Sequence, residues 1–108
     1  MNYEIIIKDI PKLSFNVYNS AHWSKKTRFK HTLQVLLLSA SRLKLEGGYS
    51  LKFDFYFKGR KMDSVNTFHY CKIFEDVIFK EDKENRQICT ETHKDSKENK
   101  VIIKIIDK

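Results

Sequence analysis

Two acidic sites flank one segment of this 108-residue chain and could serve phosphodiester chemistry. Asp63 comes directly after a basic turn that contains Arg60 and Lys61, and the acidic pair Glu81 and Asp82 follows further along the chain. Mg²⁺ is commonly held by one or two carboxylates, while water and phosphate oxygens fill its other positions. If the flanking loops fold back, Asp63 and Asp82 could hold such an ion, which would activate water against a phosphodiester.

The same stretch also allows an ordinary structural interpretation. Asp63 or Asn66 can cap the N-terminus of a helix without any catalytic role. Lys72 and Asp76 are four residues apart, so on a helix they would share a face as an exposed ion pair worth about a few tenths of a kcal/mol. The residue types and their spacing alone leave the metal site open.

Two cysteines and two histidines suggest a weaker alternative. Cys89 and His93 are four apart in a predicted strand and so share a face, whereas His69 and Cys71 fall in a predicted helix and point apart. Four nitrogen and sulfur ligands suit zinc, but the usual short spacing between cysteines is absent. We therefore expect a buried thiol and surface histidines here.

Alternating hydrophobic residues predict the strands that must position these groups. The clearest strand is Tyr49–Lys58, in which Leu51, Phe53, Phe55 and Phe57 share one face and predict core packing. Three further segments predict strands, and the last two are expected to form a hairpin around a polar loop: Tyr3–Lys8, Gln87–His93 and Lys100–Asp107.

Apolar spacing of three and four residues predicts two helices. The first runs from Lys25 to about Leu45 with Ser24 as its N-cap, and the second runs from about Val65 to Phe79. Residues 12–23 are expected to be irregular. The predicted helical core residues are Phe29, Leu33, Leu36, Leu37, Ala40, Leu43, Phe68, Ile73, Phe74, Val77 and Ile78.

The element order β-α-β-α-β-β predicts an α+β fold. We expect a single domain over residues 1–108, in which two helices cover one mixed or antiparallel sheet. No apolar run approaches the roughly 20 residues of a membrane span, and two cysteines are too few for a disulfide scaffold. A cytoplasmic location without membrane association is the default expectation.

The net charge of +7 is unevenly distributed. Residues 1–79 carry a net charge of +6, whereas residues 80–108 carry +1. A clustered basic surface favours a polyanionic partner, most often nucleic acid, although a solvated surface is the simpler alternative. The candidate phosphate-binding residues are Lys25, Lys26, Arg28, Lys30, Arg60 and Lys61.

Over nearly its whole length the chain resembles the RusA-like family of phage and prophage Holliday junction endonucleases. The resemblance rests on a strand followed by Pro11, on a basic turn followed by Asp63 and Asn66, and on the terminal strand pair. It also rests on these residues: Ile10, Ser14, Phe15, Asn16, His22, Trp23, Ser24, Lys72, Asp76, Glu81 and Asp82.

This resemblance implies a homodimer that binds branched DNA and resolves four-way junctions with Mg²⁺ or Mn²⁺ in phage recombination and repair. Asp63 matches the first metal-binding aspartate of the family and Asp82 matches the second residue of its acidic pair, so that Glu81 is a further metal candidate. Lys72 matches a catalytic or phosphate-binding lysine.

One departure from the family pattern suggests a second function. Val65 stands where the family has another aspartate, and each missing carboxylate removes both charge and coordination from a divalent-ion site. The alternative is a catalytically inactive RusA-like binding protein. Such a protein would bind DNA junctions without cutting them, or would inhibit a host nuclease or defence complex. A small basic adaptor without a nucleic-acid role is a third possibility.

Overall fold

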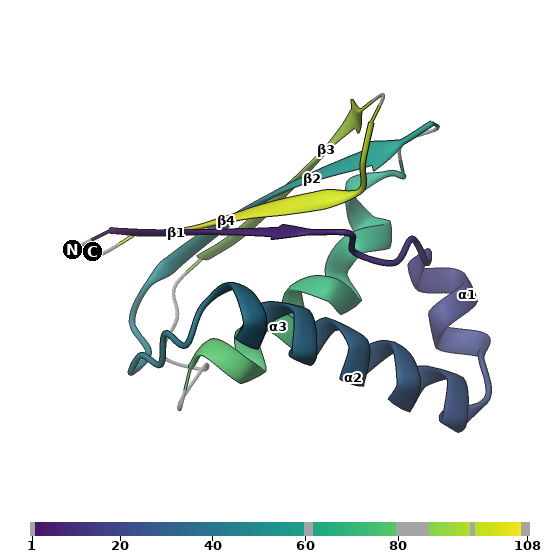
Figure 1. Cartoon of the computed structure of the whole chain (residues 1–108), viewed down its shortest axis with the longest axis horizontal. Helices are drawn as coiled ribbons and strands as arrows, with labels where there is room; N and C mark the ends of the chain where they lie inside the picture. The colour runs from purple at the N-terminus through teal and green to yellow at the C-terminus, as the bar shows by residue number, and fades with distance from the viewer. Residues whose placement is uncertain (1, 60–61, 80–86, 96, 107–108) are drawn as a thin grey trace.

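The computed structural model describes residues 2–59, 62–79, 87–95 and 97–106. They form an α+β fold, as predicted, in which helices pack on one side of a four-stranded mixed sheet (Figure 1). In chain order the elements are β1 (Tyr3–Lys8), α1 (Phe15–Ser20), α2 (Trp23–Ala40), β2 (Ser50–Lys58), the 3₁₀ turn η1 (Ser64–Thr67), α3 (Phe68–Ile78), β3 (Gln87–Asp95) and β4 (Lys100–Ile106).

The strand order in the sheet is β1-β4-β2-β3, which corrects the expected terminal hairpin. β4 pairs antiparallel with both β1 and β2, and β3 pairs parallel with the other edge of β2. β4 is rich in isoleucine and suits a central position, whereas polar β3 suits an edge. The parallel pair requires a crossover, and η1 and α3 supply it between β2 and β3.

The core lies between the sheet and the helices, where the alternation of the strands predicted it. Phe53, Phe55 and Phe57 of β2 are completely buried, and so are Val101, Ile103 and Ile105 of β4. Leu33 and Leu37 of α2 and Phe74 and Ile78 of α3 cover this face of the sheet. Two predicted core residues are exposed instead, Ala40 at the last position of α2 and Phe68 at the first position of α3.

The helix boundaries differ from the prediction for local reasons. The segment expected to be irregular contains α1, whose N-cap Ser14 accepts a hydrogen bond from the amide of Val17. α2 begins after His22, because Nδ1 of this imidazole accepts from the amide of Ser24 and so replaces the predicted serine cap. α2 ends at Ala40, and the chain beyond it is extended enough for Leu45 to form a β-bridge with Phe79.

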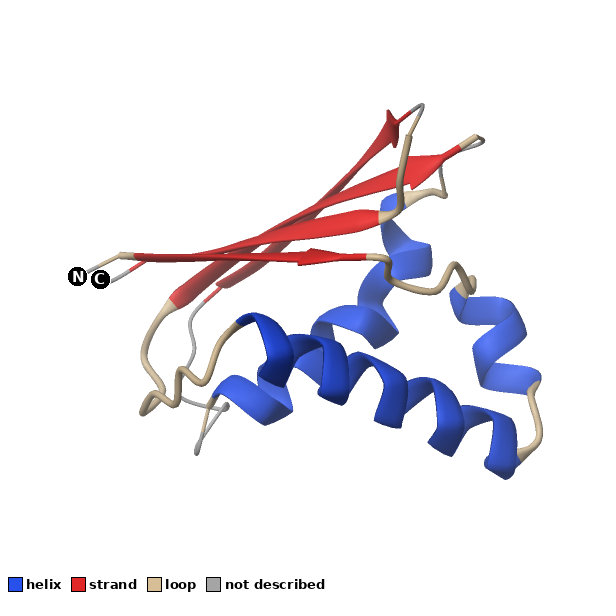
Figure 2. Cartoon of the chain, viewed as in Figure 1, coloured by secondary structure: helices blue, strands red, loops and turns tan. Residues whose placement is uncertain are grey.

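The other side of the sheet carries no helix in the described part of the chain (Figure 2). We call this side the open face. It presents the strand residues that alternate with the core positions, most of them polar but two of them isoleucines: Glu4, Ile6, Lys8, Lys52, Asp54, Tyr56, Cys89, Glu91, His93, Lys100, Ile102 and Lys104. Among the described residues, no helix is long and apolar enough to span a membrane.

Candidate nucleic-acid interface

The first half of α2 is a basic surface. Lys25, Arg28 and Lys30 are exposed, and Lys26 is half-buried with its ammonium 5.8 Å from the centre of the Tyr18 ring. Phe29 and Leu33 take the buried positions of the same turns, so the helical period leaves the cations facing outward.

Lys12 extends this surface. It lines a hollow of about 270 Å³ together with Lys25 and Arg28. We refer to Lys12, Lys25, Lys26, Arg28 and Lys30 as the basic helical face. Residues 10–45, which include α1 and α2, contain seven Lys or Arg residues and no Asp or Glu, so this stretch itself supplies no acidic side chain to offset the cations. The dipole of the 18-residue α2 adds positive potential at its N-terminus, next to these residues.

Two aromatic residues, Tyr18 and Trp23, lie beside the basic helical face. Trp23, the first residue of α2, is 71% exposed, so it does not cover the core. Tyr18 is half-buried and does cover the core, because its ring stacks on the ring of His69 with centroids 4.8 Å apart. Of these two aromatic residues, Trp23 is therefore the one that is exposed for contact with a partner.

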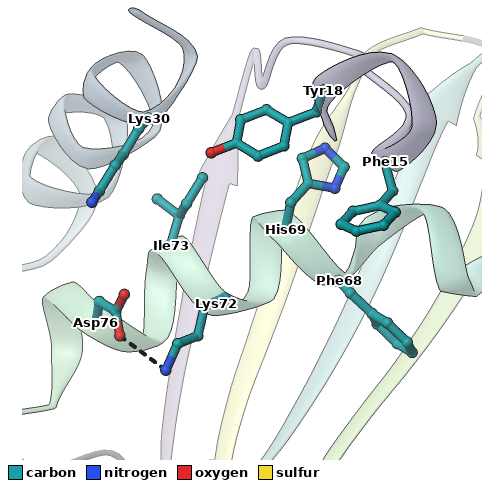
Figure 3. Close-up of a pocket in the computed structure, with 8 residues that line it drawn as sticks. All are labelled: Phe15, Tyr18, Lys30, Phe68, His69, Lys72, Ile73 and Asp76. Atoms are coloured by element: carbon teal, nitrogen blue, oxygen red, sulfur yellow. Dashed lines mark ion pairs between the residues drawn. The ribbon is translucent and has the colours of Figure 1, made fainter. Parts of the chain in front are cut away.

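A pocket of about 390 Å³ lies between α1, α2 and α3 (Figure 3). Lys30 of α2 and Lys72 of α3 both line it, so the fold brings together a predicted phosphate-binding residue and a predicted catalytic one. Nζ of Lys72 lies 3.3 Å from Oδ1 of Asp76, which confirms the ion pair expected from their spacing. The pocket thus combines aromatic walls with two cations and one carboxylate.

His69 forms the floor of this pocket. Its Nε2 lies 2.7 Å from the carbonyl oxygen of Leu13, and since a carbonyl only accepts, Nε2 carries the proton. Nδ1 is buried and has no hydrogen-bond partner among the residues that the structure describes. Burial lowers the pKa of the imidazole, against the smaller opposite effect of the Leu13 hydrogen bond, so the ring is neutral at neutral pH.

Asp63 is the one predicted metal ligand within the described residues. It is exposed and precedes η1, where its carbonyl oxygen accepts from the amide of Asn66 at 2.9 Å. Its side chain makes no capping hydrogen bond, so the carboxylate is not used as the structural cap that the sequence also allowed. An exposed carboxylate without a capping role fits the preference of Mg²⁺ for oxygen ligands. The other predicted residues at this site lie outside the described residues: Arg60, Lys61, Glu81 and Asp82.

A different group of side chains has the arrangement that could hold a metal ion, and the sequence did not predict these residues as a group. Asp54 of β2 and Glu91 and His93 of β3 place their ligand atoms within 4.8 Å of one another on the open face. The spacing of Glu91 and His93 by two residues put them on one face of a strand. Their approach to Asp54 depends on the parallel pairing of β2 with β3.

The alternative zinc site is not formed by these residues. Cys71 is buried on the helical side of the sheet, whereas Cys89 and His93 lie on the open face. Burial also raises the pKa of the Cys71 thiol to about 12, so that it stays protonated, whereas a zinc ligand must be a thiolate. The expectation of a buried thiol is confirmed, but the expectation of surface histidines is wrong for His69, which is buried because it lies on the side of α3 that packs against α1 and α2.

No protein-family model matches this chain, and a search of curated proteins finds no match.

Proposed function

We propose that this protein binds branched DNA through the basic helical face and cuts it as a Mg²⁺-dependent, RusA-like endonuclease. The observation that carries the proposal is the concentration of cations on one layer of the molecule, in a stretch of sequence that contains no acidic residue. DNA is the polyanion that such a surface suits, because its phosphates are closely spaced and release counterions when lysine and arginine replace them.

The binding step uses the two parts of this surface differently. Lys25, Arg28 and Lys30 would contact phosphates, which gives affinity without sequence preference. Trp23 is exposed enough to stack on an unpaired base, and such bases are available where a DNA branch opens. The combination supports a preference for branched DNA over an uninterrupted duplex.

For the cutting step, the sequence resemblance assigns Asp63, Asp82 and Glu81 to a Mg²⁺ site. The metal would supply a Lewis acid and lower the pKa of a bound water molecule. Lys72, with Lys30 across the same pocket, would hold the phosphate being cut. Symmetric cleavage of a four-way junction needs two such sites, which is the reason for proposing a homodimer.

A second candidate function rests on Val65. If the missing carboxylate leaves the metal site too weak, the protein is a RusA-like scaffold that binds DNA junctions without cutting them, or that targets a host nuclease or defence complex.

Charge reversal tests the binding step. We expect the double variant Lys25→Glu/Arg28→Glu to bind a synthetic four-way junction at least about tenfold more weakly, and to show a salt dependence shallower by about two phosphate contacts. The matched control Lys94→Glu/Lys97→Glu makes the same change of charge at exposed lysines of β3 and of the loop after it. Equal losses in both variants, measured by fluorescence anisotropy, would argue against the basic helical face.

Nicking of the same junction with Mg²⁺ or Mn²⁺ separates the two candidate functions. The endonuclease requires that the wild type cuts and that Asp63→Asn binds but does not cut. Junction binding without cutting under all metal conditions supports the inactive scaffold. Failure to retain any DNA at low salt overturns both and leaves the basic adaptor, because phosphate contacts are strongest there.

A further inference from the structure

An acidic side chain is buried on the side of the sheet that no described helix covers. Asp54, at the centre of β2, is 6% exposed although it faces away from the core. A carboxylate removed from water needs a positive partner or strong hydrogen bonds, because the loss of hydration is costly. The groups around Asp54 therefore indicate which kind of cation can neutralise this carboxylate on the open face.

Neighbouring side chains on β2 and β3 surround this carboxylate. Nε2 of His93 lies 3.1 Å from Oδ1 of Asp54 and 3.8 Å from Oε2 of Glu91. The ring of Tyr56 stacks on His93 with centroids 4.7 Å apart, which holds the imidazole in this orientation. All of these contacts of Asp54 are made by Oδ1, so this oxygen is the ligand atom that Asp54 contributes to the cluster.

Lys52 is the competing cation, and it fits poorly. Its ammonium lies 4.0 Å from Oδ1 of Asp54 and 3.7 Å from Oε1 of Glu91, distances longer than a hydrogen bond. Its side chain is 38% exposed. A lysine held so loosely can move into solvent when a second cation enters.

We propose that Asp54, Glu91 and His93 bind a divalent first-row transition metal ion, such as Zn²⁺ or Co²⁺, on the open face of the sheet. One imidazole nitrogen with two carboxylate oxygens suits these metals better than Mg²⁺, which takes oxygen ligands. A tetrahedral ion with ligands at about 2.1 Å places neighbouring ligand atoms about 3.4 Å apart. The ligand atoms of His93 and Asp54 already lie about this far apart. Glu91, whose side chain is 57% exposed, can rotate to bring its carboxylate to the same distance from them.

The site would leave coordination positions open to water or to an external ligand. Three protein ligands are fewer than the four of a structural zinc site. This metal site lies on the open face, whereas Asp63 directly precedes η1, a turn that contacts α1 and α3, so the metal site does not rest on the proposed endonuclease.

Cobalt titration of the full chain tests the proposal, with Cys89→Ser as the background because Cys89 is an exposed thiol on the same face and thiols are metal ligands. We expect one Co²⁺ per chain, detected by visible absorption and calorimetry. His93→Ala should weaken binding by more than about tenfold, whereas His31→Ala, at an exposed position of α2, should not. Glu91→Gln, at an exposed position, repeats the test if His93→Ala fails to fold.

Lys52→Met distinguishes a metal site from a simple network of ion pairs. Removing the competing cation should tighten Co²⁺ binding if the carboxylates are metal ligands. The proposal is overturned if Lys52→Met does not tighten binding, or if His93→Ala and Glu91→Gln both bind Co²⁺ as the background chain does. Asp63→Asn should leave this titration unchanged, so its outcome is separate from that of the junction assays.

Discussion

His69 shows how much one side chain depends on its surroundings. Its sequence position, between an exposed phenylalanine and a buried tyrosine, indicates only a helix. In the fold, one ring nitrogen is committed to the Leu13 carbonyl, and the aromatic rings of Tyr18 and Phe29 stack against the imidazole. Protonation would place a charge among apolar rings, which is why burial lowers the pKa.

The stability of the protein should therefore depend on pH through His69. Its ordinary pKa is 6.5, so below that value the unfolded chain takes up a proton that the folded chain refuses. The contribution of the neutral His69 ring to the free energy of unfolding is fully present above pH 6.5. It is lost as the pH falls toward the lowered pKa of the folded state. Between about pH 8 and pH 5, the wild type should lose more free energy of unfolding than His69→Gln does.

Urea denaturation at both pH values measures this difference, and His31→Gln provides a control at an exposed histidine. If His69→Gln loses as much stability on acidification as the wild type, the buried imidazole does not govern the acid response.

At the scale of elements, the hydroxyl of Tyr70 joins α3 to the chain that leaves β1. It donates to the carbonyl oxygen of Pro11 at 2.6 Å and accepts from the amide of Leu13 at 2.8 Å. The ring itself is completely buried against Phe55 and Phe29. One side chain thus fixes where α1 begins relative to α3, and the pocket in Figure 3 lies between these elements.

Tyr70→Phe should destabilise the protein, because it leaves two backbone groups without their partner. Each stranded group costs roughly 1–3 kcal/mol, so we expect a loss of about 2 kcal/mol or more. Tyr18→Phe is the matched control, since the Tyr18 hydroxyl makes no hydrogen bond with any residue in the described ranges. Chemical denaturation compares the two variants, and equal effects would contradict the role assigned to Tyr70.

For the whole molecule, strand order decides which parts of the sheet open last. β4 is hydrogen-bonded on both sides, whereas β1 and β3 each have one neighbour in the described sheet. An edge strand leaves alternate backbone amides unpaired, and local opening reaches it first.

Amide hydrogen exchange should follow this order. The amides of Val101, Ile103 and Ile105 should exchange most slowly, and those of β3 should exchange faster than those of β2. Two-dimensional NMR after transfer to D₂O measures these rates. Equal protection in β3 and β4 would contradict the assignment of β3 to an edge of the sheet and of β4 to its centre.

Local patterns were sufficient for much of the fold. The alternation in β2 gave its two faces, and the spacing of Phe29, Leu33 and Leu37 identified the buried side of α2. The exposure of the basic residues of α2 could be predicted from the same spacing, because a helix that buries one stripe of residues must expose the others. Capping was less predictable, since His22 performs the role for which serine is the commoner choice.

The sequence by itself determined the fold class, the main helices and strands and the position of the charge, because each follows from a period of two or of about 3.6 residues. Only the tertiary structure decided that β4 lies between β1 and β2, that Lys30 and Lys72 line one pocket, and that Asp54 meets Glu91 and His93. These three arrangements join residues far apart in the chain. They depend on which strands pair and on how the crossover through α3 packs, and no local period encodes either.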